Sequence, residues 1–187
     1  MRWFDIAKEL SPTIKEGNTQ AAIGRVSEVL RSLPPSPFHQ VLHLDFTNPP
    51  EGVAEHFDHF LRAQKSRFKV RAVYTETNGF DINPDRWYFD LFAYRKYGGH
   101  DDYDWLSGWD SENSPDMTLT GLEALQAVYD SDDFRDKAYR QACEFCSLVV
   151  VTKFQDLIRR SLPFTRELDV PVLAPSHEYD FIAEFRK

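Results

Sequence analysis

Apolar residues recur at helical spacing in several stretches of this 187-residue chain. Between Thr19 and Leu33 the apolar positions fall on one helical face, with Thr19 as a candidate N-cap and Pro34-Pro35 ending the run. The same spacing predicts further helices at residues 3–10, 50–61, 120–129 and about 133–160. Amphipathic helices therefore occupy both halves of the sequence.

Three local signals set the expected ends of these helices. Pro12 should interrupt the first helix, because proline cannot donate to the preceding turn. Pro50 suits the first turn of the helix that follows Asn48, since its missing N–H costs nothing there. Thr120 and Glu123 have the spacing of a capping box, which predicts that a helix begins at Thr120.

Alternation with a period of two residues, together with short apolar runs, predicts four strands. Over residues 67–76 apolar and mostly basic positions alternate, which is typical of a half-exposed strand. Residues 87–94 are apolar on both faces apart from Asp90, and we predict a central strand at about 86–95, antiparallel to the one before. We also predict strands at residues 38–46 and, at an edge of the sheet, at 178–186.

The order of these elements indicates the fold class. Helices and strands follow one another without a βαβ rhythm, so we predict an α+β fold with a mainly antiparallel sheet of about four strands. With 42% hydrophobic residues, residues 1–187 suffice for one globular domain with its own core. We expect a cytoplasmic protein with no membrane partner, because the sequence has neither a signal-peptide pattern nor a membrane-length apolar run.

The two cysteines, Cys143 and Cys146, lie on the apolar stripe of the last predicted helix. A redox pair works best at a helix N-terminus, and a metal site would need further ligands of the same kind. We therefore interpret both as reduced core residues.

Negative charge is concentrated in one segment of the chain. The net charge is −8, yet residues 101–136 contain eleven acidic residues and one basic residue, and the remainder of the chain carries a small positive charge. Such an asymmetry concerns binding partners rather than the fold, and it disfavours direct binding of nucleic acid.

The start of this segment mixes acidic residues with two tryptophans. In a helical turn Trp105 and Trp109 would share one face. One interpretation is a surface loop that is pinned by these rings. We favour another, a contact surface for a basic protein, in which charge speeds association and aromatic rings supply affinity. The predicted contact residues are Asp101, Asp102, Asp104, Trp105, Trp109 and Asp110. An inhibitor or immunity-type protein, without enzymatic activity, fits this interpretation.

An alternative function rests on two carboxylates in the predicted hairpin. Glu76 continues one face of its strand, and Asp90 interrupts an otherwise apolar strand. Such carboxylates are paired, hydrogen-bonded or protonated, and two together can do acid–base chemistry. The protein would then be a small hydrolase or ligand-binding domain with an aromatic pocket. The expected lining of that pocket is Tyr74, Trp87, Tyr88 and Phe92. The structural interpretation is that Arg86 or Arg95 neutralises one of the pair.

No metal or cofactor is expected. The patterns that come closest to a metal site are His56-Phe57-Asp58-His59, His39 with His43 and Asp45, and Asp81-Ile82-Asn83-Pro84-Asp85. The first lacks the zinc-peptidase spacing, and histidines on a strand more often satisfy core hydrogen bonds. The third has Arg86 and Phe92 where a calcium loop needs glycine and glutamate. Nucleophile-elbow, P-loop and dinucleotide motifs are also absent from the sequence.

Overall fold

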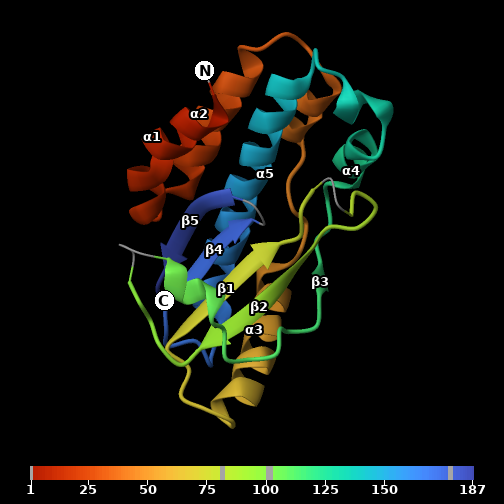
Figure 1. The fold of residues 1–187 in the computed structure, drawn as a ribbon. Coiled ribbons are helices and arrows are strands. Elements are labelled where there is room, and N and C mark those ends of the chain that lie inside the picture. Colours follow the sequence, from red (N-terminus) through yellow and green to blue (C-terminus); the bar gives the residue numbers. More distant parts are fainter. Residues whose placement is uncertain (1, 81–82, 100–102, 177–178) are drawn as a thin grey trace.

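The computed structural model describes residues 2–80, 83–99, 103–176 and 179–187 (Figure 1). The α-helices are α1 (Trp3–Lys15), α2 (Thr19–Arg31), α3 (Pro50–Lys65), α4 (Glu123–Tyr129) and α5 (Arg140–Ser161). The 3-10 helices are η1 (Pro37–His43), η2 (Asp104–Ser107), η3 (Asp132–Arg135) and η4 (Leu162–Phe164). The strands are β1 (Ala72–Thr77), β2 (Tyr88–Tyr94), β3 (Met117–Thr118), β4 (Val172–Ser176) and β5 (Tyr179–Phe185).

These strands form one sheet in the order β3-β2-β1-β4-β5. The predicted hairpin is confirmed, because β1 and β2 pair antiparallel, and β5 lies at an edge as predicted. The first strand of the hairpin begins at Ala72, however, and not at residue 67 as predicted. The α+β class is confirmed as well. The sheet has five strands and is mixed rather than purely antiparallel, since β4 runs parallel to β1.

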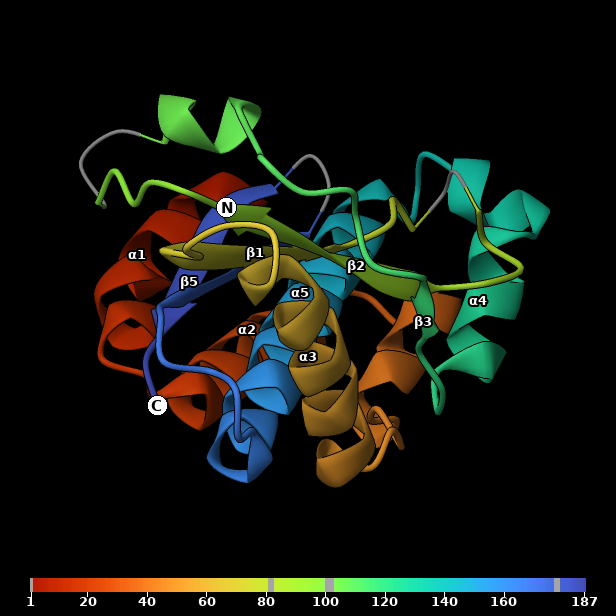
Figure 2. The same ribbon diagram turned by 90° about the horizontal axis from the view of Figure 1, so that it is seen from below.

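The helices α1, α2, α3 and α5 cover one face of this sheet, and η2 lies on the other (Figure 2). Helix α5 is central to the helical layer, and it packs against α2, α3 and β4. From Phe145 to Ile158 its side chains are buried almost without interruption, which is typical of a helix surrounded by other elements. None of the helices in the described ranges is both long and apolar enough to cross a membrane.

The prediction of a strand at residues 38–46 is wrong. Pro37 begins η1, where Ser36 caps the turn through the ring of His39 at 2.9 Å. The buried Lys153 of α5 then donates from Nζ to the carbonyl oxygens of Val41 and Leu44. The ammonium group supplies these carbonyl oxygens with the hydrogen-bond donors that a neighbouring strand would otherwise supply. The stretch can therefore be buried without pairing in the sheet.

Several predicted helix ends are also wrong. The helix expected from Thr120 begins at Glu123, because Gly121 has a φ of +100° and the Thr120 amide donates to Asn48 instead. A positive φ cannot continue a right-handed helix. Helix α1 runs through Pro12 rather than ending there. Helix α2 is capped by Asn18 instead of Thr19, and α5 begins only at Arg140.

Both cysteines are free, and Cys146 is completely buried in α5 as predicted. Cys143 is only partly buried and lies at the margin of the core. Burial raises the pKa of the Cys146 thiol, so this side chain is an unreactive core group.

Candidate functional site

Strands β1 and β2 alternate their side chains between the helical layer and the opposite face of the sheet. Val73, Thr75 and Thr77 are fully buried on the helical side. The opposite face carries Ala72, Tyr74 and Glu76 from β1 and Tyr88, Asp90, Phe92 and Tyr94 from β2. Glu76 therefore lies on the same face of β1 as Ala72 and Tyr74, as the alternation predicted. This face is the one opposite the helical layer.

The loop that leaves β2 crosses back over this opposite face and is fixed there by Trp105. The indole ring of Trp105 makes edge contacts with Tyr94 at 5.0 Å and Tyr97 at 5.6 Å between centroids. Its Nε1 donates to the carbonyl oxygen of Gly99 at 3.2 Å. A Cβ atom on Gly98 would lie 2.2 Å from the same ring, so only glycine fits there. Trp105 thus pins the loop, as expected for a half-buried tryptophan.

Trp109 lies differently from Trp105, with 54% of its surface exposed. Its ring contacts Phe92 at 5.5 Å, and Phe92 contacts Tyr74 at 6.0 Å. These three side chains form a continuous aromatic row from β1 across β2 to solvent. Trp109 is exposed, and Phe92 and Tyr74 behind it are partly buried; a contiguous apolar surface of this kind is typical of an interaction site.

Three carboxylates stand beside this aromatic row, and we call them the carboxylate cluster: Glu76, Asp90 and Asp116. Glu76 and Asp90 are direct cross-strand partners in the β1–β2 register. The Tyr74 hydroxyl donates to Glu76 Oε2 at 2.7 Å. The Oδ1 atom of Asp90 is buried and has no hydrogen-bond partner among the described residues. A carboxylate that is both crowded and partly desolvated favours its protonated form.

The pKa of Asp90 reflects this environment. Burial, and after it the negative charge of Asp116, raise that pKa to about 6. Arg86 pairs with Asp116 at 2.8 Å, and Arg95 pairs with Asp110 at 3.3 Å. The two arginines expected to neutralise Glu76 or Asp90 are therefore bound to other carboxylates.

We expect the substitution Asp90→Asn to stabilise the protein above pH 6. The folded chain retains a proton on Asp90 that the unfolded chain loses, so wild-type stability falls between about pH 4 and pH 6 and is then constant. Because the side chain is partly exposed, solvent screening reduces the full linkage energy, and the expected gain is about 1 kcal/mol. Urea denaturation at several pH values measures it. If wild type and Asp90→Asn are equally stable above pH 6, Asp90 ionises normally. The control is Asp104→Asn in exposed η2, which should leave the stability unchanged.

The remaining predicted contact residues are distributed as follows. Asp104 is exposed in η2. Asp110 accepts from the Arg95 amide at 2.7 Å in addition to its ion pair, which ties the loop to the end of β2. Asp101 and Asp102 lie outside the described residues. The structure thus brings Glu76 and Asp90 to the same face as Trp109.

A small pocket of about 220 Å³ adjoins the carboxylate cluster and is lined by Glu76, Asp90, Tyr88 and Asn78, among others. Tyr88 was expected in such a pocket, and Tyr74 and Phe92 share its face of the sheet. Trp87 does not, because its ring is completely buried on the helical side against Phe80 and Tyr129.

The histidine pair of α3, His56 and His59, lies where His56 packs against neighbouring side chains. His56 Nε2 lies 3.2 Å from the hydroxyl of Ser114, and its ring packs edge-on against Phe89. Burial, and then the charge of His59, lower the pKa of His56. Within the described ranges, no three histidine, cysteine or acidic side chains are grouped closely enough to hold a metal ion. Of the predicted calcium-like loop, residues 81 and 82 lie outside the described residues.

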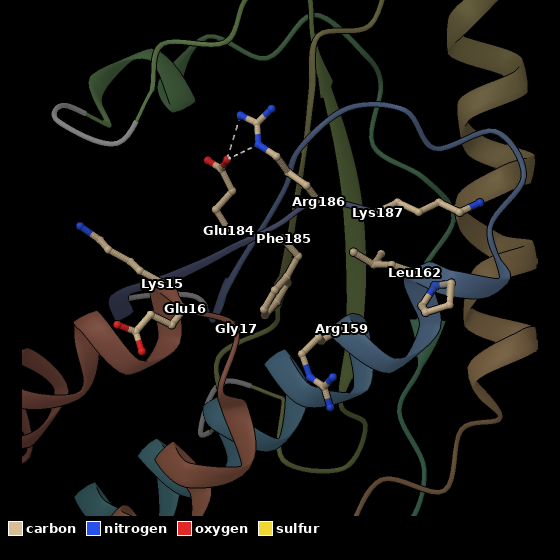
Figure 3. Close-up of a pocket in the computed structure, with 10 residues that line it drawn as sticks. Lys15, Glu16, Gly17, Arg159, Leu162, Glu184, Phe185, Arg186 and Lys187 are labelled. Carbon is tan, nitrogen blue, oxygen red and sulfur yellow. Dashed lines mark hydrogen bonds and ion pairs between the residues drawn. The ribbon is translucent and has the colours of Figure 1, made fainter.

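A larger pocket of about 770 Å³ lies between the end of α1 and the C-terminal residues (Figure 3). Its cationic side chains do not converge. Figure 3 shows Lys15, Arg159 and Lys187 pointing in different directions, and Arg186 turned away toward Glu184, with which it pairs at 3.2 Å. This pocket therefore presents no concentrated charge to a ligand.

Comparisons of the chain with protein-family models, with curated proteins and with solved structures find no match. The function is accordingly inferred from the side chains on the face of the sheet opposite the helical layer.

Proposed function

We propose that this protein is a non-enzymatic interaction domain that binds a basic protein on the face of the sheet opposite the helical layer. One observation carries the proposal: the aromatic row that ends at the exposed Trp109 lies directly beside the carboxylate cluster. Exposed Asp104 extends the negative charge of this face onto η2.

The two kinds of side chain have separate roles in such a complex. Carboxylates attract a basic surface over distance and raise the association rate. A large ring that is exposed before binding and buried afterwards contributes affinity. Lysine and arginine side chains complement both, because they pair with carboxylates and also stack on aromatic faces. Inhibitors and immunity-type proteins that act on basic nucleases use faces of this design, and we propose that class here.

We expect neutralisation of Asp101, Asp102 and Asp104 to asparagine to slow association with the partner without unfolding the protein. At low salt the association rate should fall about tenfold, and the difference should shrink above about 0.15 M salt, where the screening length is about 8 Å. The partner is isolated on immobilised wild-type protein at low salt and eluted with salt. Surface plasmon resonance then measures the rates.

The matched control removes three carboxylates elsewhere, through Glu16→Gln, Glu51→Gln and Glu55→Gln on the helical side of the protein. This variant has the same net charge as the first and should associate at nearly the wild-type rate. Equal slowing of both variants would mean that net charge, rather than this face, attracts the partner. A captured protein that is not basic would contradict the proposal directly.

A second candidate function is a ligand-binding or hydrolytic site in the 220 Å³ pocket. The raised pKa of Asp90 and its unpartnered Oδ1 favour it, because a carboxyl that is protonated near neutral pH can act as a general acid. Turnover or ligand affinity that changes near pH 6, and loses this dependence in Asp90→Asn, would favour the pocket over protein docking.

The proposed location is the cytoplasm. Both cysteines are free, and neither takes part in a disulfide bond. Free thiols are common in the reducing cytoplasm, where disulfides rarely persist.

A further inference from the structure

Cationic side chains gather at the end of the sheet opposite the carboxylate cluster. Arg71 immediately precedes β1 and Arg95 immediately follows β2, and the Arg71 amide donates to Tyr94 across the hairpin at 2.7 Å. Arg186 follows β5 at the same end, because β5 runs antiparallel to β4 and β4 parallel to β1. The start of β1 and the ends of β2 and β5 lie close together in Figure 1. The topology therefore collects these cations without any local sequence pattern.

A shallow cleft of about 610 Å³ opens between these chain ends. Four of its lining residues are cationic: Arg71, Arg95, Lys96 and Arg186. The acidic lining residue is Asp169, whose carboxylate pairs with Lys65 at 3.0 Å. In a protein with a net charge of −8, four cations facing one cleft form a marked positive site.

Two of the four cations are held by other side chains of the protein, and the other two are free to pair with a ligand. The guanidinium of Arg95 lies 4.5 Å from the ring centre of Phe68, and that of Arg186 lies 5.4 Å from the ring centre of Tyr97. Each also has one carboxylate partner. In the described part of the chain, neither Arg71 nor Lys96 forms an ion pair. The cleft thus has unpaired positive charge beside guanidinium groups that are already oriented.

We propose that this cleft binds a small phosphate-bearing anion. Guanidinium forks match the oxygen geometry of a phosphate, and a lysine ammonium adds a mobile point charge. The cleft volume is within the range of small-ligand sites. Several cations around one cleft favour a ligand with two linked phosphates over one with a single charge. The inference concerns a different site from the proposed protein-docking face and does not depend on it.

Isothermal titration calorimetry with inorganic pyrophosphate tests the proposal on the full chain. Wild-type protein should bind it, and Arg71→Gln and Lys96→Gln should each weaken binding about tenfold, because each removes one unpaired cation. Both side chains are exposed, so thermal melts should confirm intact folding. The variant Lys8→Gln, which changes another exposed lysine, in α1, should bind as the wild type does.

Three outcomes would overturn the proposal. The first is no binding of pyrophosphate at millimolar concentration, and the second is wild-type affinity in both glutamine variants. The third is equally tight binding of succinate, which would show attraction to any dianion rather than to phosphate. If a variant fails to fold, NMR titration of the wild type decides instead: pyrophosphate should shift the amides of Tyr97 and Val170 in the cleft, and unchanged shifts there would contradict the site.

Discussion

Replacing Asp156 with alanine is expected to lower the free energy of unfolding by about 3 kcal/mol. Asp156 lies in α5 and is only 3% exposed. Its carboxylate accepts from the Thr19 hydroxyl at 2.6 Å and from Arg159 and Arg160 at 2.9 and 2.8 Å. Removal of the carboxylate takes away the anion that both guanidinium groups pair with and the acceptor of the Thr19 hydroxyl. Between these side chains the hydrogen bond from Arg159 Nε to the Thr19 hydroxyl, at 2.9 Å, remains.

Denaturation by urea measures this loss, and an ion pair in the same helix supplies the control. Arg140 and Glu144 pair at 3.3 Å with four-residue spacing, and the Arg140 side chain is largely exposed while that of Glu144 is partly exposed. Exposed helical pairs contribute about 0.3–0.5 kcal/mol, so Glu144→Ala should have little effect. If Asp156→Ala costs no more than Glu144→Ala, the buried pair adds nothing to stability beyond an exposed one.

The effect of Asp156 should also depend on pH. Burial raises the pKa of Asp156, but hydrogen bonds from Thr19, Arg159, Gln20 and Arg160 together lower it by more, so the net pKa lies below its ordinary value. A depressed carboxyl pKa stabilises the fold fully above the pKa of the unfolded chain and loses that effect as the pH falls through the folded value. The difference between wild type and Asp156→Ala should therefore shrink in acid.

Local signals in the sequence predicted the elements that depend on few distant partners. The alternation at residues 67–76 and the apolar run 86–95 identified the β1–β2 hairpin, and proline placement identified α3. Strand β4 was missed, because its apolar residues 172–174 form a short run between Pro171 and Pro175 that is buried on both faces and has no alternation. The stretch 38–46 was assigned to the sheet because the pattern gives no sign of the buried Lys153 that binds its carbonyls.

The sequence predicted individual residues of the candidate site but not their arrangement. The sequence singled out Glu76, Asp90 and Trp109, but their presence on one face depends on the hairpin register and on the return of the loop after β2. Asp116 was not recognised as part of the site, because it reaches Asp90 only through the short pairing of β3 with β2.

The charge count of residues 101–136 also overstated the negative field of this segment. Asp110 and Asp116 pair with Arg95 and Arg86, which lie outside the segment. A linear count cannot include partners that are brought in by folding. The negative charge that remains on the face opposite the helical layer is consequently smaller than the sequence indicated, and the aromatic row matters correspondingly more.

We therefore expect Trp109→Ala to weaken binding of the basic partner by at least about 30-fold, which corresponds to a central aromatic contact of about 2 kcal/mol. The fold should be nearly unaffected, because the ring is 54% exposed and touches the rest of the protein through Phe92. The loss should appear as faster dissociation and persist at high salt, since burial of a ring is not screened. Surface plasmon resonance with the isolated partner measures both rates.

Phe4→Ala is the matched control for this experiment. Phe4 is 55% exposed, nearly the same as Trp109, but it belongs to α1 in the helical layer on the other side of the sheet. If exposed rings merely promote nonspecific adhesion, both variants will lose affinity to a similar degree and the proposed face is wrong. The proposal expects only Trp109→Ala to lose affinity. It also expects Asp104→Asn to slow association at low salt but not at high salt. Together these results would show that ring burial and charge attraction both act on the face of the sheet opposite the helical layer.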